Sequence, residues 1–369
     1  MKELQIKDIC EKGSSNLKQK DVEGKDGLYP VYGASGIISH IDTYHQEKNY
    51  IAIVKDGSGI GRVSFMPAKS SVIGTMQYIL PKEGFDINYI GYCLQSLDLS
   101  KYKQGAAIPH IYFRDYGERI VKVSDDLKEQ QSIVDYLDSA FAKIDKMKAN
   151  AEKALNEAKA LFQASLKEML KPKEGWEKKT LGELATDMYR GSGIKRDQVT
   201  KEGIPCVRYG EIYTTYNVGF DTCVSHTKIE YVSSPKYFEH GDLLFAITGE
   251  SVEDIGKTIA YLGNEKCLCG GDIICMKHEQ NPKFLAYALS TPDAIRQKGM
   301  GKTKLKVVHT NAPALKAISV PVPTLGEQKS IVDHLDTIKS KIDKLQENFG
   351  KISQECDVLK QAILRQVFE

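Results

Sequence analysis

The ten-residue stretch EQQSIVDYLD, from Glu129 to Asp138, returns with only two changes as EQKSIVDHLD, from Glu327 to Asp336. When the sequence is aligned with itself at an offset of about 198 positions, residues 127–170 match residues 325–368 without gaps, and about 20 of 44 positions are identical. A match of this length indicates an internal duplication. We therefore expect two copies of one structural unit, each closing with this segment.

Both copies of the segment have the apolar pattern of a long helix. Apolar residues recur in alternating steps of three and four, which is the seam pattern of a coiled coil. We predict that small side chains of the first helix face bulky ones of the second. The predicted seam residues are Leu137, Ile144, Ala151, Ala154 and Leu161 in the first helix and Leu335, Ile342, Leu345, Phe349, Ile352 and Leu359 in the second. The alternative is that each amphipathic helix packs only on its own domain.

Two longer segments with a different composition precede the two helices. They contain short runs rich in Gly, Tyr, Val and Ile between turn residues, such as NYIAIVKDGSGIGRVSFM and GDLLFAITGE. Each also contains a short helix-like run, NYIGYCLQSL or KFLAYALSTP. The sequence thus predicts an α+β protein with a mainly β domain at 1–125, a helix at 126–171, a second mainly β domain at 172–324 and a second helix at 325–369.

Composition narrows the class of protein. The 369 residues carry a net charge of only +2, so affinity for nucleic acid would have to come from basic residues gathered on particular faces. The eight cysteines show no CxxC spacing, and we expect reduced thiols and no metal site. No apolar run reaches the length of a signal peptide or a membrane span, so we expect a soluble cytoplasmic protein that does not bind membranes.

Motifs of catalysis are missing from the sequence. The glycines of DGSGIGR lack the strand, helix and acidic residue of a dinucleotide site, so we interpret them as a tight turn in a β domain. No Walker loop, HExxH or nucleophile elbow is present. We therefore predict no catalytic residue and no bound cofactor, and we expect a protein that is not an enzyme.

Basic and aromatic residues are candidates for DNA contacts. In RQKGMGKTKLKVVH, alternate lysines would align on one face of a strand, where they suit a phosphate backbone. Arginine and amide side chains elsewhere could read base edges. A solvated, charged edge strand is the alternative for the basic stretches. The candidates are Arg62, Lys101, Lys103, Gln104, His110 and Arg114 in the first domain and Lys195, Arg196, Arg208, Tyr209, Lys298, Lys302, Lys304, Lys306 and His309 in the second.

Taken together, these motifs resemble the specificity subunit of type I restriction-modification systems. The resemblance covers the whole chain and rests on the duplicated LxEQxxIVxxLD motif and on the phrases YPVYGASGI, VIGTM, GAAIPHIYFRDY, GIPCVRYGEI and GDLLFAITGE. YPVYGASGI adds Tyr32 and Ser35 to the DNA-binding candidates.

The resemblance implies two target-recognition domains spaced by an antiparallel two-helix coiled coil with pseudo-two-fold symmetry. Each domain would read one half of a split site in double-stranded DNA. Two modification subunits would methylate adenine and restriction subunits would cleave, and S-adenosylmethionine, Mg²⁺ and ATP would bind only to these partners. A coiled-coil scaffold that binds other proteins without reading DNA is the alternative.

Overall fold

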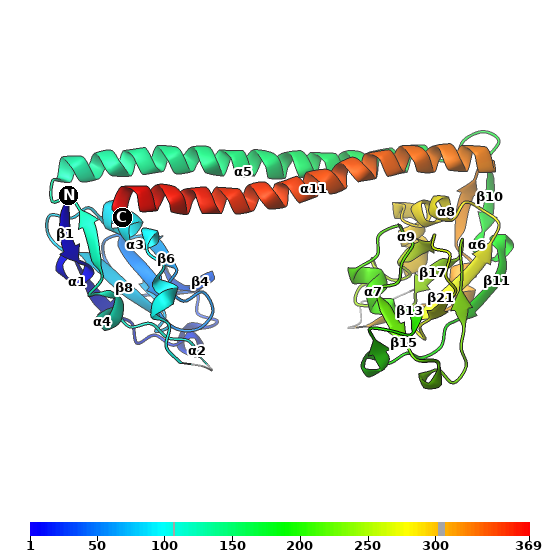
Figure 1. Ribbon diagram of the computed structural model, residues 1–369, viewed down its shortest axis with the longest axis horizontal. Helices are drawn as coiled ribbons and strands as arrows, with labels where there is room; N and C mark the ends of the chain where they lie inside the picture. Colours follow the sequence, from blue (N-terminus) through cyan, green and yellow to red (C-terminus); the bar gives the residue numbers. More distant parts are fainter. Residues whose placement is uncertain (106–107, 302–306) are drawn as a thin grey trace. The chain divides into compact units, whose positions relative to one another are not determined.

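A computed structural model describes residues 1–105, 108–301 and 307–369 (Figure 1). Its two longest elements are the helices α5 (Leu127–Met169) and α11 (Leu325–Phe368). The duplicated segments therefore form long helices, as the sequence predicts.

The chain forms two compact units, and each contains one mainly β domain. The first unit joins Met1–Lys153 to Glu347–Glu369, and the second comprises Ala154–Gln346. Each unit thus includes part of α5 and part of α11. The predicted α+β class is confirmed.

Domain 1, in the first unit, is built from two small sheets. The first has the order β2-β8-β5-β6 and the second the order β4-β3-β7. Their strands are β2 (Cys10–Ser14), β8 (Met76–Pro81), β5 (Tyr50–Val54), β6 (Val63–Met66), β4 (Gly36–Ile41), β3 (Tyr29–Gly33) and β7 (Ser71–Val72). Every residue of β5 is buried, because Ile51 and Ile53 face one hydrophobic cluster and Tyr50, Ala52 and Val54 face another. This strand explains the uninterrupted apolar run YIAIV.

Domain 2, in the second unit, has two five-stranded sheets with the orders β11-β21-β17-β19-β14 and β12-β15-β13-β20-β16. The strands of the first are β11 (Ala185–Arg190), β21 (Ile273–His278), β17 (Leu243–Ala246), β19 (Thr258–Tyr261) and β14 (Gly219–Phe220). Those of the second are β12 (Val199–Thr200), β15 (Ser225–Thr227), β13 (Ile204–Val207), β20 (Cys267–Cys269) and β16 (Tyr237–Phe238). Strand β17 is fully buried, like β5 in domain 1.

The two copies have the same pair of strands where a domain meets its long helix. In each, a strand at the start of the domain pairs antiparallel with the strand that precedes the helix. The pairs are β1 (Lys2–Gln5) with β9 (Ile120–Val123) and β10 (Glu177–Thr180) with β23 (Ser319–Val322). A short helix follows the first strand of each pair, α1 (Ile6–Ile9) or α6 (Leu181–Leu184). Matching elements at matching places show that the duplication extends into the domains.

The repeated glutamine of the EQ motif joins each domain to its helix. Gln130 is fully buried, accepts the Asp86 backbone N–H at 2.7 Å and donates to the carbonyl oxygens of Gly84 (2.9 Å) and Ser124 (3.0 Å). Gln328 is equally buried and accepts the Asn281 N–H at 2.9 Å. A buried amide needs such partners, and here the partners are backbone groups where the domain meets its helix. The repeated glutamine thus has the same structural role in both copies.

Asp86 and Asn281 in turn cap two further short helices. Asp86 accepts the backbone N–H groups of Asn88 and Tyr89 at the start of α3 (Ile87–Ser96), and Asn281 caps α8 (Pro282–Ala288). These helices confirm the two helix-like segments predicted from the sequence. The remaining short helices are α2 (Gln19–Val22), α4 (Phe113–Tyr116), α7 (Tyr209–Thr214), α9 (Pro292–Gly299) and α10 (Ala312–Lys316).

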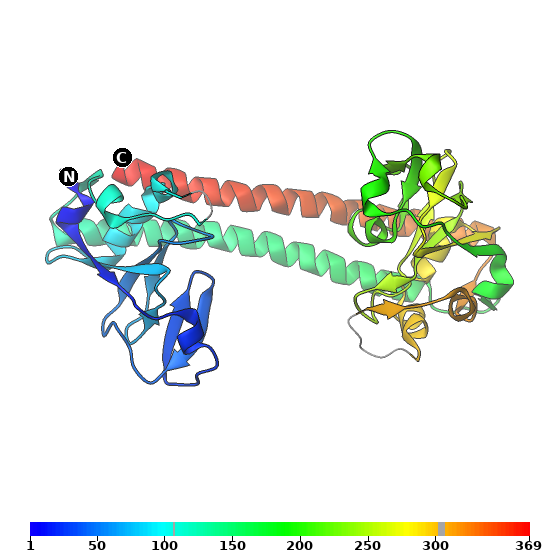
Figure 2. The ribbon, with the colours of Figure 1, turned by 90° about the horizontal axis from the view of Figure 1, so that it is seen from below.

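Within each unit, a stretch of α5 lies alongside a stretch of α11 (Figures 1 and 2). In the first unit, the Cys356 thiol donates to the Ile144 carbonyl oxygen at 3.8 Å, and Lys360 forms an ion pair with Asp145 at 2.6 Å. Early residues of one helix contact late residues of the other, so the helices are antiparallel. The pairing predicted from the two apolar seams is thus present.

The buried stripe on these helices differs in phase from the predicted seam. Leu137, Ile144, Leu335 and Ile342 are buried, and Ala151, Phe349 and Ile352 are half-buried. By contrast, Leu161, Leu345, Leu359 and Ala154 are exposed. In the first helix, Leu155 is buried and Phe162 is half-buried, whereas the predicted Ala154 and Leu161 are exposed, so the later part of the stripe lies one residue after the predicted seam. The reason is that each helix packs on a domain as well as on the other helix, and both contacts set the buried face.

All eight cysteines are buried free thiols. Among the helices of the described residues, none combines the length and the apolar character needed to cross a membrane.

Candidate nucleic-acid interface

In domain 1, two loops that carry predicted DNA contacts lie against each other. Gly57, Gly59 and Gly61 have φ values of 83°, 85° and 85°, which favour glycine and confirm the tight turn. Arg62 follows this turn, and its Nη1 donates to the Ala34 carbonyl oxygen at 2.8 Å. That contact holds the glycine turn beside the β3–β4 turn, where Ser35 is exposed. Tyr32, at the end of β3, is half-buried against the core.

A third loop of domain 1 joins these two. His110 Nδ1 lies 2.7 Å from Asp56 Oδ1, next to the glycine turn. The backbones of His110 and Gln104 exchange two hydrogen bonds of 2.8 Å, and the Gln104 amide also donates to Asp115 at 2.7 Å. The amide and imidazole are thus held in place by acidic neighbours.

Planar side chains form a small stack at the end of this loop and in the first turn of α4. The His110 and Tyr112 rings lie 6.4 Å apart and nearly parallel, and the Arg114 guanidinium lies 4.7 Å from the centre of the Tyr112 ring. Lys101 and Lys103 are exposed close by in sequence. Aromatic, guanidinium and lysine groups on one loop cluster are the chemistry that binds nucleic acid. We name this group of loops, residues 32–35, 56–62 and 101–114, the domain 1 loop cluster; residues 106–107 are outside the described part of the chain.

In domain 2, the loops after β11 and β13 converge on the end of β20. The Ser192 backbone N–H donates to the Cys269 carbonyl at 2.8 Å, and the Gly270 N–H donates to the Val207 carbonyl at 2.9 Å. A Cβ at Gly270 would lie 2.6 Å from the Val207 oxygen, so only glycine allows this approach. Lys195 and Arg196 are exposed after β11, Arg208 is half-buried after β13, and Tyr209, the first residue of α7, is exposed. We name residues 192–196 and 208–209 the domain 2 loop cluster.

The other predicted contacts of domain 2 lie elsewhere. His309 is on β22 (Val308–His309), which pairs with β18 (Thr248–Gly249), and its Nδ1 lies 3.2 Å from the Thr248 hydroxyl. Lys302, Lys304 and Lys306 lie outside the described residues, so the expectation of a basic strand stays a prediction.

One predicted contact is wrong: Lys298 is not on the surface. It is 6% exposed, and its Nζ donates to the Leu289 carbonyl oxygen at 2.8 Å and to the Thr258 hydroxyl at 3.1 Å. Burial lowers the pKa of this amine from 10.5 to about 7. Basic residues surround Lys298 in the sequence, but its position on α9 directs its side chain into the core, where it cannot reach a phosphate.

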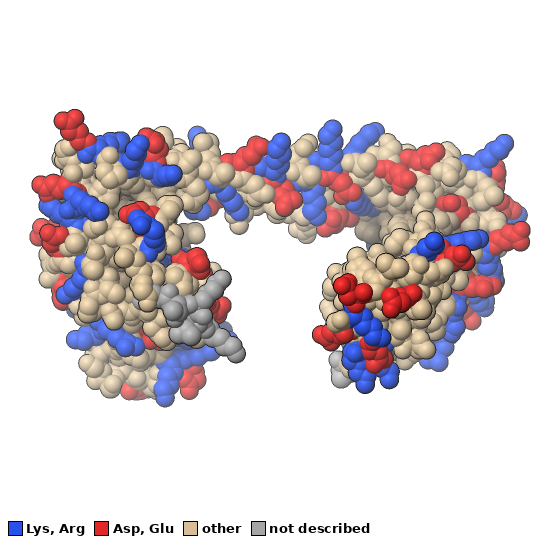
Figure 3. All heavy atoms as spheres, turned by 180° about the vertical axis from the view of Figure 1, so that it is seen from behind, with Lys and Arg blue, Asp and Glu red and all other residues tan. Residues whose placement is uncertain are grey.

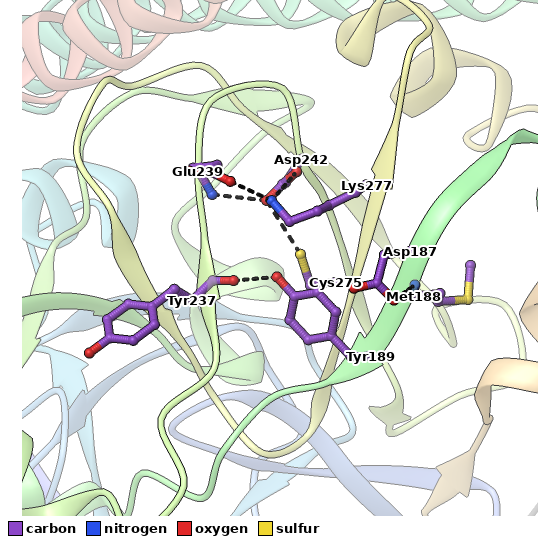
Figure 4. A network of polar contacts seen from close by, with 8 residues as sticks. All are labelled: Asp187, Met188, Tyr189, Tyr237, Glu239, Asp242, Cys275 and Lys277. Atoms are coloured by element: carbon purple, nitrogen blue, oxygen red, sulfur yellow. Dashed lines mark hydrogen bonds and ion pairs between the residues drawn. The ribbon is translucent and has the colours of Figure 1, made fainter.

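Domain 2 also contains a network of carboxylate, lysine, thiol and tyrosine side chains (Figure 4). Asp242 is 4% exposed and accepts from Lys277 Nζ at 3.1 Å, from the Glu239 backbone N–H at 2.9 Å and from the Cys275 thiol at 3.6 Å. Burial raises the pKa of Asp242 and of the Cys275 thiol. Asp242 directly precedes β17, and its partners Cys275 and Lys277 are on β21, so the network ties the start of β17 to β21.

Sequence inspection missed contacts that depend on distant residues. Lys266 Nζ lies 5.0 Å from the centre of the Tyr237 ring, which is remote in sequence. Arg190, just before the domain 2 loop cluster, donates to the Asp272 carboxylate at 2.9 Å. Its place directly before the GSGIKRD stretch is the one signal in the sequence that points to it. Along the long helices, Lys and Arg alternate with Asp and Glu, so no purely basic stripe covers them on the face in Figure 3.

Over residues 1–157 and again over 173–350, the sequence matches the family described as the type I restriction modification DNA specificity domain. The chain belongs to this family, which confirms the resemblance inferred from the duplicated motif.

Curated relatives are specificity subunits. The StySPI specificity subunit of Salmonella potsdam is 24% identical over 199 residues, which cover 52% of this chain and 42% of that subunit. The EcoBI specificity subunit of Escherichia coli is 21% identical over 213 residues, covering 56% of this chain and 41% of that subunit. The chain spans less than half the length of the curated relatives it matches.

Solved structures share the fold. A structure described as the basis of complex assembly and conformational transition of the type I R-M system aligns with a TM-score of 0.72 at 16% identity, covering 98% of this chain and 96% of that one. The HsdS subunit from Thermoanaerobacter tengcongensis aligns with a TM-score of 0.55 at 16% identity, covering 98% and 95%.

Proposed function

We propose that this chain is the DNA-reading, non-catalytic subunit of a type I restriction-modification complex. Domain 1 reads one half of a bipartite site in double-stranded DNA and domain 2 reads the other half. The observation that carries the proposal is the duplication itself: each copy presents a cluster of loops with basic and aromatic side chains on its own rigid β scaffold.

The side chains of the loop clusters suit two kinds of contact. Arg62, Gln104 and Arg208 have planar groups that can form paired hydrogen bonds with base edges in the major groove. Lys103 and Lys195 carry point charges that suit phosphates and position the protein without reading sequence. No hydrogen-bond partner for the Arg208 guanidinium is found among the described residues, which leaves it available to a base.

Methylation and cleavage of the DNA would be carried out by partner subunits in the cytoplasm. Two modification subunits methylate adenine, and restriction subunits cleave. Duplicated helices and domain junctions would let two identical modification subunits dock in equivalent ways. S-adenosylmethionine, Mg²⁺ and ATP would then act on the partners alone. Titration of this chain with S-adenosylmethionine tests that assignment, because tight binding to the isolated chain would contradict it.

Methylome sequencing of a host that expresses the chain with its modification subunit identifies the site. Fluorescence anisotropy then compares a duplex carrying that site with a duplex in which both half-sites are scrambled. We expect tighter binding to the intact site and a steep loss of affinity with salt. Equal and weak binding to both duplexes, with a shallow salt dependence, would refute the proposal and favour a protein-binding scaffold.

A further inference from the structure

Next to domain 1, the first unit has a groove of about 540 Å³ between α3, β6 and the two long helices. Aromatic rings form its walls. Phe65 and Tyr92 meet edge to face at 5.4 Å, and Tyr92 and Phe141 do so at 5.5 Å. The Phe65 ring is 39% exposed and lies directly on Gly91, where any Cβ would overlap it. The groove therefore offers apolar surface that the unit itself does not cover.

A carboxylate lies within these walls. Asp138, the last residue of the first EQ stretch, lines the groove and accepts the Tyr92 hydroxyl. Its side chain is exposed, and among the described residues it forms no ion pair. Lys360 also lines the groove, but its ammonium group pairs with Asp145 and lies 5.3 Å from the centre of the Phe141 ring. An aromatic groove with an unpaired carboxylate is suited to a positively charged group.

The second copy of the repeat shows the equivalent carboxylate with a cation in place. Asp336 accepts the Tyr287 hydroxyl at 2.8 Å, as Asp138 accepts that of Tyr92, and it also forms an ion pair with Lys283. Lys283 is four residues before Tyr287 on α8, so the two side chains share one face of the helix. Four residues before Tyr92 on α3, the first copy has the neutral Asn88.

Seven residues further along each long helix, about two turns, the matching carboxylates Asp145 and Asp343 each have a lysine partner. In the first unit, Lys360 pairs with Asp145 at 2.6 Å. In the second, Lys339 pairs with Asp343 at 2.6 Å. The second unit thus has a lysine for each of its two carboxylates, whereas the first has one lysine for Asp138 and Asp145 together.

We propose that the groove beside domain 1 binds a lysine or arginine side chain of a partner protein, with Asp138 as its counter-ion. The Tyr92 ring contacts the stem of the incoming side chain, and Phe65 contacts an apolar neighbour in the same segment. The Phe141 ring already has the Lys360 ammonium group 5.3 Å from its centre and is not part of this contact. Lys283 occupies the equivalent place in domain 2 and shows how the ammonium group is held. Arginine suits the site best, because its planar group both stacks on rings and pairs with a carboxylate. This inference concerns protein docking and is independent of DNA reading.

Saturation-transfer NMR on the full chain tests the proposal with the peptide Ac-Gly-Leu-Arg-Leu-Gly-NH2. The same peptide with citrulline in place of arginine has nearly the same shape but no charge. We expect saturation of the arginine methylene protons and about fivefold less for the citrulline peptide. Asn88→Lys copies the arrangement of domain 2 and should reduce the arginine signal by a similar factor, as should Asp138→Asn. The matched change in the second copy, Asp336→Asn, should leave the signal unchanged.

Carbodiimide labelling of carboxylates with glycine ethyl ester, read by mass spectrometry, gives a second measurement on folded protein. Asp138 should be labelled faster than Asp336, and Asn88→Lys should slow the labelling of Asp138. The proposal is wrong if the arginine peptide shows no saturation, if it binds Asn88→Lys as well as the parent chain, or if Asp138 and Asp336 are labelled at the same rate.

Discussion

Replacing the buried Lys298 by methionine should stabilise the second unit at neutral pH. The pKa of Lys298 is about 7 in the folded chain and 10.5 when the amine is exposed. At pH 7 the amine is almost fully protonated in the unfolded chain, and its burial on folding destabilises the folded state. One pKa unit corresponds to about 1.4 kcal/mol, and the cost at pH 7 is therefore about 4 kcal/mol. Methionine has a similar length, is uncharged and removes this cost.

The hydrogen bonds of the amine offset part of this gain. Removal of Nζ takes a donor from the Leu289 carbonyl and from Thr258, and each lost bond costs about 1 kcal/mol. Thr258 keeps its own hydrogen bond to the Gly256 carbonyl at 2.9 Å. The net expectation is that Lys298→Met raises the free energy of unfolding by about 2 kcal/mol at pH 7.

The difference between the two proteins should depend on pH in a defined direction. Because the folded pKa is lowered, the unfolded chain binds more protons between pH 7 and 10.5, and parent stability rises with pH in that window. The Met variant lacks this contribution, so its advantage should shrink as the pH rises and vanish at about pH 9 to 9.5. Glu253, Asp254 and Lys257 line the same small cavity and are common to both proteins, so they largely cancel in the comparison.

Urea unfolding followed by tryptophan fluorescence measures these free energies. Trp176 is the chain's only tryptophan and packs against the core of the second unit that also contains Ala294 of α9. Lys201→Met, at an exposed position, is the matched control and should change stability by less than about 0.5 kcal/mol. A Lys298→Met variant that is less stable at pH 7, or a difference that does not vary between pH 7 and 9.5, would refute the reasoning.

Three further predictions concern the helices, the repeated glutamine and the DNA contacts. On α5, Ile144→Ala should lower the free energy of unfolding by about 2 to 4 kcal/mol because Ile144 is buried, whereas Leu161→Ala, at an exposed position, should lower it by less than about 0.5 kcal/mol. Equal losses in urea unfolding would support the seam predicted from the sequence. Gln328→Ala should lower the free energy of unfolding by about 1 to 3 kcal/mol, because it removes the donor to the buried Pro323 carbonyl; Lys329→Ala, at an exposed position, is the control. If thermal unfolding shows no loss of stability for Gln328→Ala, the repeated glutamine has no structural role. Arg208→Ala should relax the specificity at one base position and cost about 1 to 3 kcal/mol of binding free energy, whereas Lys103→Gln should weaken binding to all duplexes alike and reduce the slope of log affinity against log salt by about 0.9. If Arg208→Ala weakens binding to all duplexes equally in anisotropy titrations, Arg208 contacts a phosphate.

The sequence by itself determined the organisation of this protein. The duplication, the two long helices, the two mainly β domains and the family are all readable, because they rest on identity between copies and on periodicity along the chain. The turn at Gly57, Gly59 and Gly61 was also predictable, since a positive φ is a local property of glycine.

Only the tertiary structure decided which side chains are buried and which are paired. Lys298 looks like its basic neighbours in sequence, yet α9 turns it into the core. Asp138 and Asp336 end nearly identical peptides, but one has a lysine partner from a distant helix and the other does not. The seam of α5 shifted because a domain and a second helix compete for the same face. Burial and charge pairing depend on residues far apart in the chain, and a pattern in one segment contains no information about them.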